Sequence, residues 1–72
     1  PTNTLALNNK AYDLIFLDRA DEALEIINKV LEIKKGVALY WETKGQILQK
    51  LGRDDEAKEC FARGNEIKAI HD

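Results

Sequence analysis

The chain repeats itself with a period of 34 residues. The stretch RADEALEIINKVLEIKKG begins at Arg19, and RDDEAKECFARGNEIKAI begins at Arg53. When residues 4–36 are laid over residues 38–70 without a gap, 12 of the 33 pairs are identical. Unrelated segments of this length would share roughly two. The period therefore indicates one supersecondary unit used twice, which restricts the chain to a small array of like parts.

Apolar residues within each unit follow the spacing of α-helices. In the first unit Leu7, Ala11, Leu14 and Leu17 recur at steps of four and three residues, which places them on one helix face. A second stripe follows at Ala23, Leu24, Ile27, Val30 and Leu31. The pattern predicts helices over 4–17, 20–34, 38–51 and 54–70, and the short connections predict antiparallel hairpins.

Charged and small residues mark the expected ends of the second helix. Asp18 and Asp21 stand where that helix begins, and acidic groups there complement the positive end of the helix dipole. Gly36 follows the last turn, where we expect it to adopt a left-handed conformation. The segment 34–36 lacks a proline, so the sequence also allows a domain-swapped dimer. The second and third helices would merge into one rod, and two copies would exchange hairpins.

The second unit resembles the tetratricopeptide repeat family. It carries an aromatic residue, a glycine four positions later, a central alanine, a second aromatic residue and a further small residue, namely Trp41, Gly45, Ala57, Phe61 and Gly64. It departs from the family at Lys44, where the family prefers leucine, at Leu48, where it prefers tyrosine, and at Ala69, where it has proline. The first unit matches more weakly, with Leu7, Ala11 and Ala23 at the corresponding places.

The resemblance covers nearly the whole chain and implies its architecture. It implies an all-α fold of two tandem helix-turn-helix hairpins, with four helices and right-handed superhelical stacking. Residues 1–72 would form a single domain, with repeat one at about 4–37 and repeat two at about 38–71. A plain four-helix bundle that arose by duplication is the alternative.

The small residues of the signature have a physical reason. Helices that pack closely need alanine or glycine where their backbones approach. We expect these contact points at Ala11, Ala23, Gly45, Ala57 and Gly64. Trp41 and Phe61 would fill the space between the helices of the second hairpin.

No constellation of catalytic residues is recognisable in the sequence. His71 is the only histidine and lies next to the end of the chain. Cys60 has no basic partner fixed beside it on its helix and is expected to be a small buried hydrophobic residue. Asp54 and Asp55 are acids at a helix start. We therefore expect no enzyme activity, no cofactor and no metal.

The resemblance implies a scaffold for protein–protein interaction, in which the first helices of successive repeats line a concave groove for a peptide or helix. By position, the groove residues are Leu5, Asn8, Asn9, Tyr12, Ile15, Phe16, Leu39, Glu42, Thr43, Gln46, Gln49 and Lys50. Asparagine and glutamine can donate to and accept from a peptide backbone, which suits this use. Simple solvated surface is the alternative reading of the same residues.

Part of this family binds the acidic C-terminal tails of chaperones through a carboxylate clamp. The clamp would need a basic residue at Asn8 and asparagine at both Tyr12 and Thr43. All three positions depart from that pattern. We therefore expect no binding of chaperone tails by a carboxylate clamp.

Large apolar residues in the first helix predict a contact surface. With Leu14 and Leu17 toward the core, Ile15 and Phe16 would point outward and form an exposed patch with Tyr12. Such patches mark contacts with other proteins. A structural oligomerisation module that self-associates without a separate peptide ligand is therefore the alternative function. Burial of the patch under another segment of the chain is the competing interpretation.

The remaining features concern the ends of the array and the partners. Lys58 and Asn65 stand where the first unit has Leu24 and Leu31, so the far end is expected to be closed by polar residues while the near end is open. Because two repeats are few, either the chain is a fragment of a longer array or copies associate. A net charge of −2 gives no general attraction to nucleic acid or membrane, and no apolar run approaches a membrane span. The single cysteine predicts a reducing, cytoplasmic location.

Overall fold

The described part of the chain, residues 3–71 without the side chain of His71, folds into four α-helices. In this computed structural model they are α1 (Thr4–Phe16), α2 (Ala20–Ile33), α3 (Ala38–Lys50) and α4 (Asp54–His71). Each end lies within one residue of its predicted position, so the all-α prediction is confirmed. The side chain of His71, the only histidine of the sequence, lies outside the described residues.

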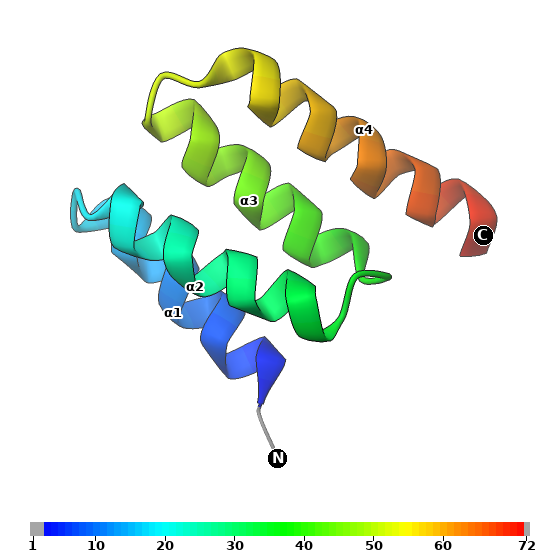
Figure 1. Cartoon of the computed structure of the whole chain (residues 1–72), viewed down its shortest axis with the longest axis horizontal. Coiled ribbons are helices and arrows are strands. Elements are labelled where there is room, and N and C mark those ends of the chain that lie inside the picture. The colour runs from blue at the N-terminus through cyan, green and yellow to red at the C-terminus, as the bar shows by residue number, and fades with distance from the viewer. Residues whose placement is uncertain (1–2, 72) are drawn as a thin grey trace.

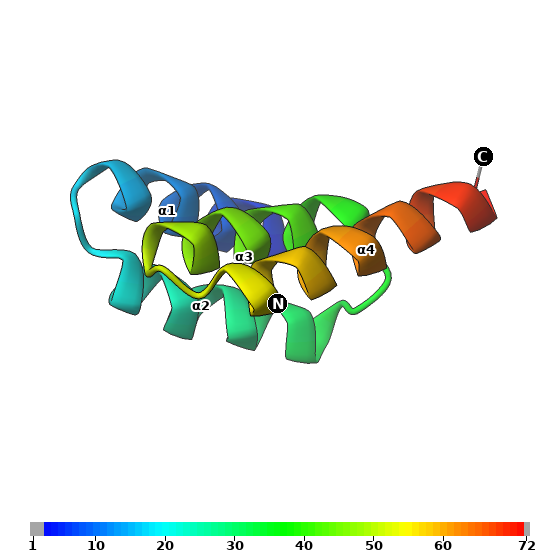
Figure 2. The ribbon, with the colours of Figure 1, turned by 90° about the horizontal axis from the view of Figure 1, so that it is seen from above.

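The helices form two hairpins that stack through α2 and α3. Figure 1 shows α3 between α2 and α4, with α1 behind α2. α3 packs against each of the other three helices, whereas the backbone of α4 lies next to α3 alone. Figure 2 shows that α1 and α3 form one layer on the opposite side from α2. The first helices of the two hairpins are therefore neighbours.

Both hairpins turn in the same way. The turn residue has a positive φ in each, 61° at Asp18 and 77° at Gly52. The backbone amide of the next residue, Arg19 or Arg53, then donates to a carbonyl of the preceding helix, at 3.0 Å and 2.8 Å respectively. Aspartate is one of the few side chains that tolerate this left-handed conformation. Asp18, which the sequence places where α2 begins, makes the turn before that helix.

The connection between the hairpins differs from the prediction. Gly36 does not adopt a positive φ. Instead α2 ends at Ile33, and its capping residue Lys34 has an extended backbone with φ −135° and ψ 94°. A turn follows, so α2 and α3 are separate helices in the single chain. The continuous rod considered above is not present in this structure.

Small residues lie at the helix contacts, as the sequence predicts. Ala11 and Ala23 are fully buried between α1 and α2, and Ala57 is buried against α3. A Cβ atom at Gly45 would lie 2.6 Å from Cε1 of Phe61, so the backbone of α3 approaches the ring of α4 as closely as glycine allows. This contact sets the spacing of the second hairpin.

Two predictions about α1 were wrong. Ile15 is buried, with 8% of its surface exposed, and Leu17 is 62% exposed. α1 ends at Phe16, and Leu17 is the residue that caps it, so Leu17 no longer continues the helix face of Leu14. Ile15 instead joins the core cluster that α1 and α2 share with α3. The apolar spacing of Leu7, Ala11 and Leu14 indicates only one buried face of this helix.

α3 has a second buried face that the sequence analysis missed. Tyr40 and Ile47 are buried in the same core cluster as Val30 and Leu31 of α2. The hydroxyl groups of Tyr40 and Thr4 share a hydrogen bond of 2.9 Å, which ties the start of α1 to α3. A helix with neighbours on several sides buries residues on more than one face, which a single apolar stripe does not reveal.

The end of α4 lies beyond its partner helix. α4 has 18 residues and α3 has 13, and the C-terminal turns of α4 extend past α3 in Figure 1. Ile70 is 78% exposed there and contributes nothing to the core. None of the helices in residues 3–71 is both long and apolar enough to cross a membrane.

Candidate functional site

A shallow hollow lies between α1 and α3, on the side where these first helices are neighbours. Its lining comes entirely from the predicted groove: Asn8, Asn9, Tyr12, Leu39, Glu42, Thr43 and Gln46. Of the other predicted groove residues, Leu5, Phe16, Gln49 and Lys50 are exposed, and Ile15 is buried. The structure therefore brings seven of the twelve residues together. We call this hollow the α1–α3 groove.

An unpaired polar atom lies beneath the α1–α3 groove. Asn8 is only 3% exposed, and its Oδ1 is buried without a hydrogen-bond partner among the described residues. Thr43 is equally buried, but its hydroxyl donates to the carbonyl of Leu39 at 3.0 Å. A buried polar atom without a partner costs stability, typically about 1–3 kcal/mol. No contact within the described residues explains why a polar side chain is buried at Asn8.

An ion pair and an aromatic pair border the α1–α3 groove. Nζ of Lys68 on α4 lies 2.8 Å from Oε2 of Glu42 on α3, which neutralises the acid in the groove. Tyr12 and Phe16 pack edge to face, with ring centroids 5.2 Å apart and an angle of 71°. These rings are 41% and 72% exposed, and with Leu17 they form an apolar ledge on α1. This Tyr12–Phe16–Leu17 ledge replaces the predicted patch, which included Ile15.

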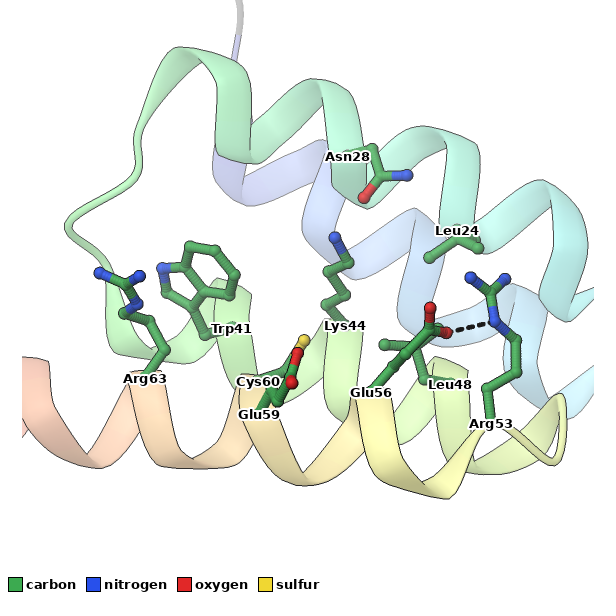
Figure 3. A pocket seen from close by; sticks show the side chains of 10 residues that line it. All are labelled: Leu24, Asn28, Trp41, Lys44, Leu48, Arg53, Glu56, Glu59, Cys60 and Arg63. Carbon is green, nitrogen blue, oxygen red and sulfur yellow. Dashed lines mark hydrogen bonds and ion pairs between the residues drawn. The ribbon is translucent and has the colours of Figure 1, made fainter.

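A second hollow lies between α2, α3 and α4 and was not predicted (Figure 3). We call it the α2–α4 groove. Its lining combines apolar and charged side chains: Leu24, Asn28, Trp41, Lys44, Leu48, Arg53, Glu56, Glu59, Cys60 and Arg63. The one signal in the sequence was Lys44, a charged residue where the family prefers leucine. The other charged residues lie on α4 and in the turn before it, and no recognised motif groups them.

Trp41 has a fixed place in the α2–α4 groove. Its indole nitrogen donates to the carbonyl of Lys35 at 2.8 Å. Nζ of Lys44 lies 5.9 Å from the ring centroid, and Cζ of Arg63 lies 5.6 Å from it. Both distances are within the range of cation–π interactions, which stabilise a cation over an indole face. The indole of Trp41 therefore interacts with two cationic side chains, Lys44 and Arg63.

Three ionisable groups of the α2–α4 groove have shifted pKa values: Glu56, Cys60 and Arg53, whose pKa is raised mainly by its hydrogen bond to Glu56. The hydrogen bond from Arg53 is the main cause that lowers the pKa of the Glu56 carboxyl. Burial raises the pKa of the Cys60 thiol, which keeps it protonated at neutral pH. A protonated, buried thiol is a poor nucleophile. No group of three or more His, Cys, Asp or Glu side chains in the described region is placed to bind a metal ion.

Paired helices, with grooves on two sides and alanine or glycine at the helix contacts, define a helical-repeat scaffold. Comparison with protein families matches the chain to the tetratricopeptide repeat over residues 5–36 and 38–71. The chain therefore belongs to the tetratricopeptide repeat family, and the alternative of an unrelated four-helix bundle is excluded. Repeats of this family are scaffolds for protein–protein interaction and are typically not enzymes.

Two relatives come from the archaeon Methanocaldococcus jannaschii. The chain is 40% identical to TPR repeat-containing protein MJ0941 over 55 residues, which cover 76% of this chain and 16% of that protein. It is 43% identical to Uncharacterized protein MJ0572 over 44 residues, which cover 61% of this chain and 51% of that protein. The matched part thus spans about half of one relative and far less of the other. No solved structure matches the chain.

Proposed function

We propose that the chain is a non-enzymatic interaction module that binds a peptide or a short helix of a partner protein in the α1–α3 groove. The observation that carries this proposal is the buried, unpaired Oδ1 of Asn8 beneath the groove. An N–H group of a bound peptide backbone is the partner that this acceptor lacks, and a small rotation of the side chain would bring the two together. A ligand would then offset the cost of leaving the atom unpaired.

The rest of the lining supports the same occupant. Asn9 and Gln46 are exposed amides that can donate to and accept from a peptide backbone. Tyr12 and Leu39 are partly exposed apolar surfaces on opposite sides of the groove, suited to apolar side chains of a peptide. Glu42 is paired with Lys68, so the groove offers no free acid to repel an acidic partner. A cytoplasmic location, consistent with the free Cys60, is part of this proposal.

A peptide-display screen with matched variants tests the proposal. Peptides selected on the wild-type chain are titrated against Asn8→Leu and Tyr12→Ala, and against Lys58→Ala on the exposed side of α4 as the control. We expect Asn8→Leu to unfold at the same or a higher temperature, because it removes an unpaired polar atom, and yet to bind about tenfold more weakly. Selected peptides that bind all four proteins equally would contradict the proposal.

Self-association is the second candidate function, favoured by the Tyr12–Phe16–Leu17 ledge. Phe16 and Leu17 are more than 60% exposed and adjoin one another at the end of α1, and exposed apolar clusters mark contact surfaces. If copies associate through this ledge, sedimentation of the wild-type chain will show a dimer that dissociates in Phe16→Ala. A wild-type chain that is monomeric at all concentrations would exclude this candidate.

A further inference from the structure

The α2–α4 groove extends beyond the hollow drawn in Figure 3. A neighbouring hollow continues along α2 and shares three lining residues with it, Asn28, Trp41 and Lys44. The two hollows therefore form one channel between α2 and the second hairpin, with Trp41 and Lys44 at its middle. An elongated groove of this kind admits a segment of chain rather than a single ion.

The floor of this groove combines apolar surface with an unneutralised cation. Leu24, Trp41 and Leu48 supply the apolar surface, and Figure 3 shows the ammonium group of Lys44 between Trp41 and Leu24, beneath Asn28. Lys44 is half-buried, and among the described residues no carboxylate lies within 4.0 Å of its Nζ. A partly desolvated ammonium without a partner favours an anionic ligand.

The charges around the groove leave a positive centre. Arg53 and Glu56 form an ion pair with each other, so neither is free. Lys44 and Arg63 lie on either side of Trp41, and within the described residues neither is paired with an acid. Among the described lining residues the unpaired acids are Glu59 in the first hollow and Glu32 in the second, and Lys35 is a third unpaired cation, in the second hollow. The groove is thus locally basic on a chain whose net charge is −2.

We propose that the α2–α4 groove is a second binding surface, which takes an acidic peptide segment. One carboxylate of the peptide binds Lys44, a second carboxylate binds Arg63 on the other side of Trp41, and a neighbouring apolar side chain packs on Leu24 and Leu48. The positive charges favour an acidic partner, and the apolar side chains add contacts that a simple anion cannot make. This surface lies on the opposite side of α3 from the α1–α3 groove, and its occupant is independent of the ligand proposed there.

Trp41 reports on this site directly, because it is the only tryptophan of the chain and lies on the groove floor. The probe is the acetylated, amidated peptide Glu-Leu-Asp-Glu-Leu, titrated while Trp41 fluorescence is recorded. We expect a saturable change that weakens as salt is added, because salt screens partly exposed charges. The same peptide with lysine in place of each acid should give no saturable change.

The repeat supplies a matched control. Lys10 is the residue that corresponds to Lys44 in the first unit, but it is exposed and lines none of these hollows. We expect Lys44→Glu to lower the affinity for the acidic peptide at least tenfold, Lys44→Gln to lower it less, and Lys10→Glu to leave it unchanged. Circular dichroism checks that all three variants keep their helices. Tyr12→Ala should also leave this affinity unchanged, which separates the site from the α1–α3 groove.

Three results would overturn the proposal. The first is no saturable fluorescence change with the acidic peptide up to millimolar concentration. The second is an equal loss of affinity in Lys10→Glu and Lys44→Glu, since the effect would then be general electrostatics. The third is an oligouridylate that binds as tightly as the peptide with the same dependence on Lys44, because the groove would then recognise charge without the apolar anchor.

Discussion

Gly45 shows how a single residue sets the geometry of the second hairpin. Its backbone lies so close to Phe61 that an added Cβ would come within 3.0 Å of three ring atoms. Gly36, in contrast, has no neighbouring atom within 4 Å of such a Cβ and does not have a positive φ. Packing therefore requires glycine at position 45 but not at position 36.

A substitution series at these glycines tests this reading. We expect Gly45→Ala to lower the free energy of unfolding by about 1 kcal/mol, because displacement of the Phe61 ring outweighs the gain in helix propensity. In a Phe61→Leu background the same substitution should no longer destabilise, which a double-mutant cycle of thermal unfolding would measure. Gly36→Ala is the control and should be neutral or slightly stabilising. Equal effects in both backgrounds would show that the ring is not the cause.

At the scale of the helix, acidic side chains stabilise the first turn of α4. Asp54, Asp55 and Glu56 lie in that turn, where acids complement the helix dipole, and Glu56 pairs with Arg53. The same pair occurs one repeat earlier as Arg19 and Glu22, 2.6 Å apart. Both pairs are solvent-exposed, so each stabilises its helix only modestly.

The lowered pKa of Glu56 predicts a pH dependence of stability. A carboxyl whose pKa is lower in the folded state stabilises the fold above its unfolded-state pKa and loses that effect as the pH falls through the folded-state pKa. We therefore expect Glu56→Gln to be less stable than wild type at neutral pH, and the difference to vanish in acid. Urea unfolding across this pH range measures it. A difference that persisted at low pH would show that the pair acts through something other than charge.

The helix boundaries were predictable from sequence, while several buried faces were not. Boundaries depend on local signals, such as the turn at Gly52 and the acids that follow it, so they were placed within one residue. The burial of Ile15 and Tyr40 depends instead on which other helix packs beside them, and no local spacing encodes that.

Of the two candidate binding surfaces, one was predictable from sequence and the other was not. The lining of the α1–α3 groove follows repeat positions, so it could be named from the resemblance. The α2–α4 groove joins Lys44, Arg53 and Arg63, which come from two helices and a turn and become neighbours only in the folded chain. A repeat signature contains no information about such a combination.

For the whole molecule, the two outer faces of the array differ from its inner junction. At the junction, α2 contributes Leu24 and Leu31, and α3 contributes Tyr40 and Ile47. The corresponding residues on the outer face of α4 are Lys58 and Asn65, which are exposed. On α1 they are Ala6 and Asp13, also exposed. The prediction that the near end is open was therefore wrong, since both outer faces lack the apolar residues of the junction.

These faces predict how association could be engineered. We expect Ala6→Tyr, Asp13→Ile, Lys58→Leu and Asn65→Leu together to restore the junction at both ends and to join copies head to tail. Because such a contact does not close on itself, the variant should form long assemblies whose light scattering rises with concentration. The variant with the α4 changes alone is the control and should not form them. A quadruple variant that stays the size of wild type would show that these positions do not define stacking.

The central place of α3 determines the order in which the molecule can open. Of the described helices, α3 is the one in contact with all the others, so we expect its amides to be the best protected by the core. Its backbone protons should exchange with solvent last, whereas those in the overhanging final turns of α4 should exchange first. Although α1 and α3 occupy the same position in their repeats, only α3 contacts every other helix within residues 3–71.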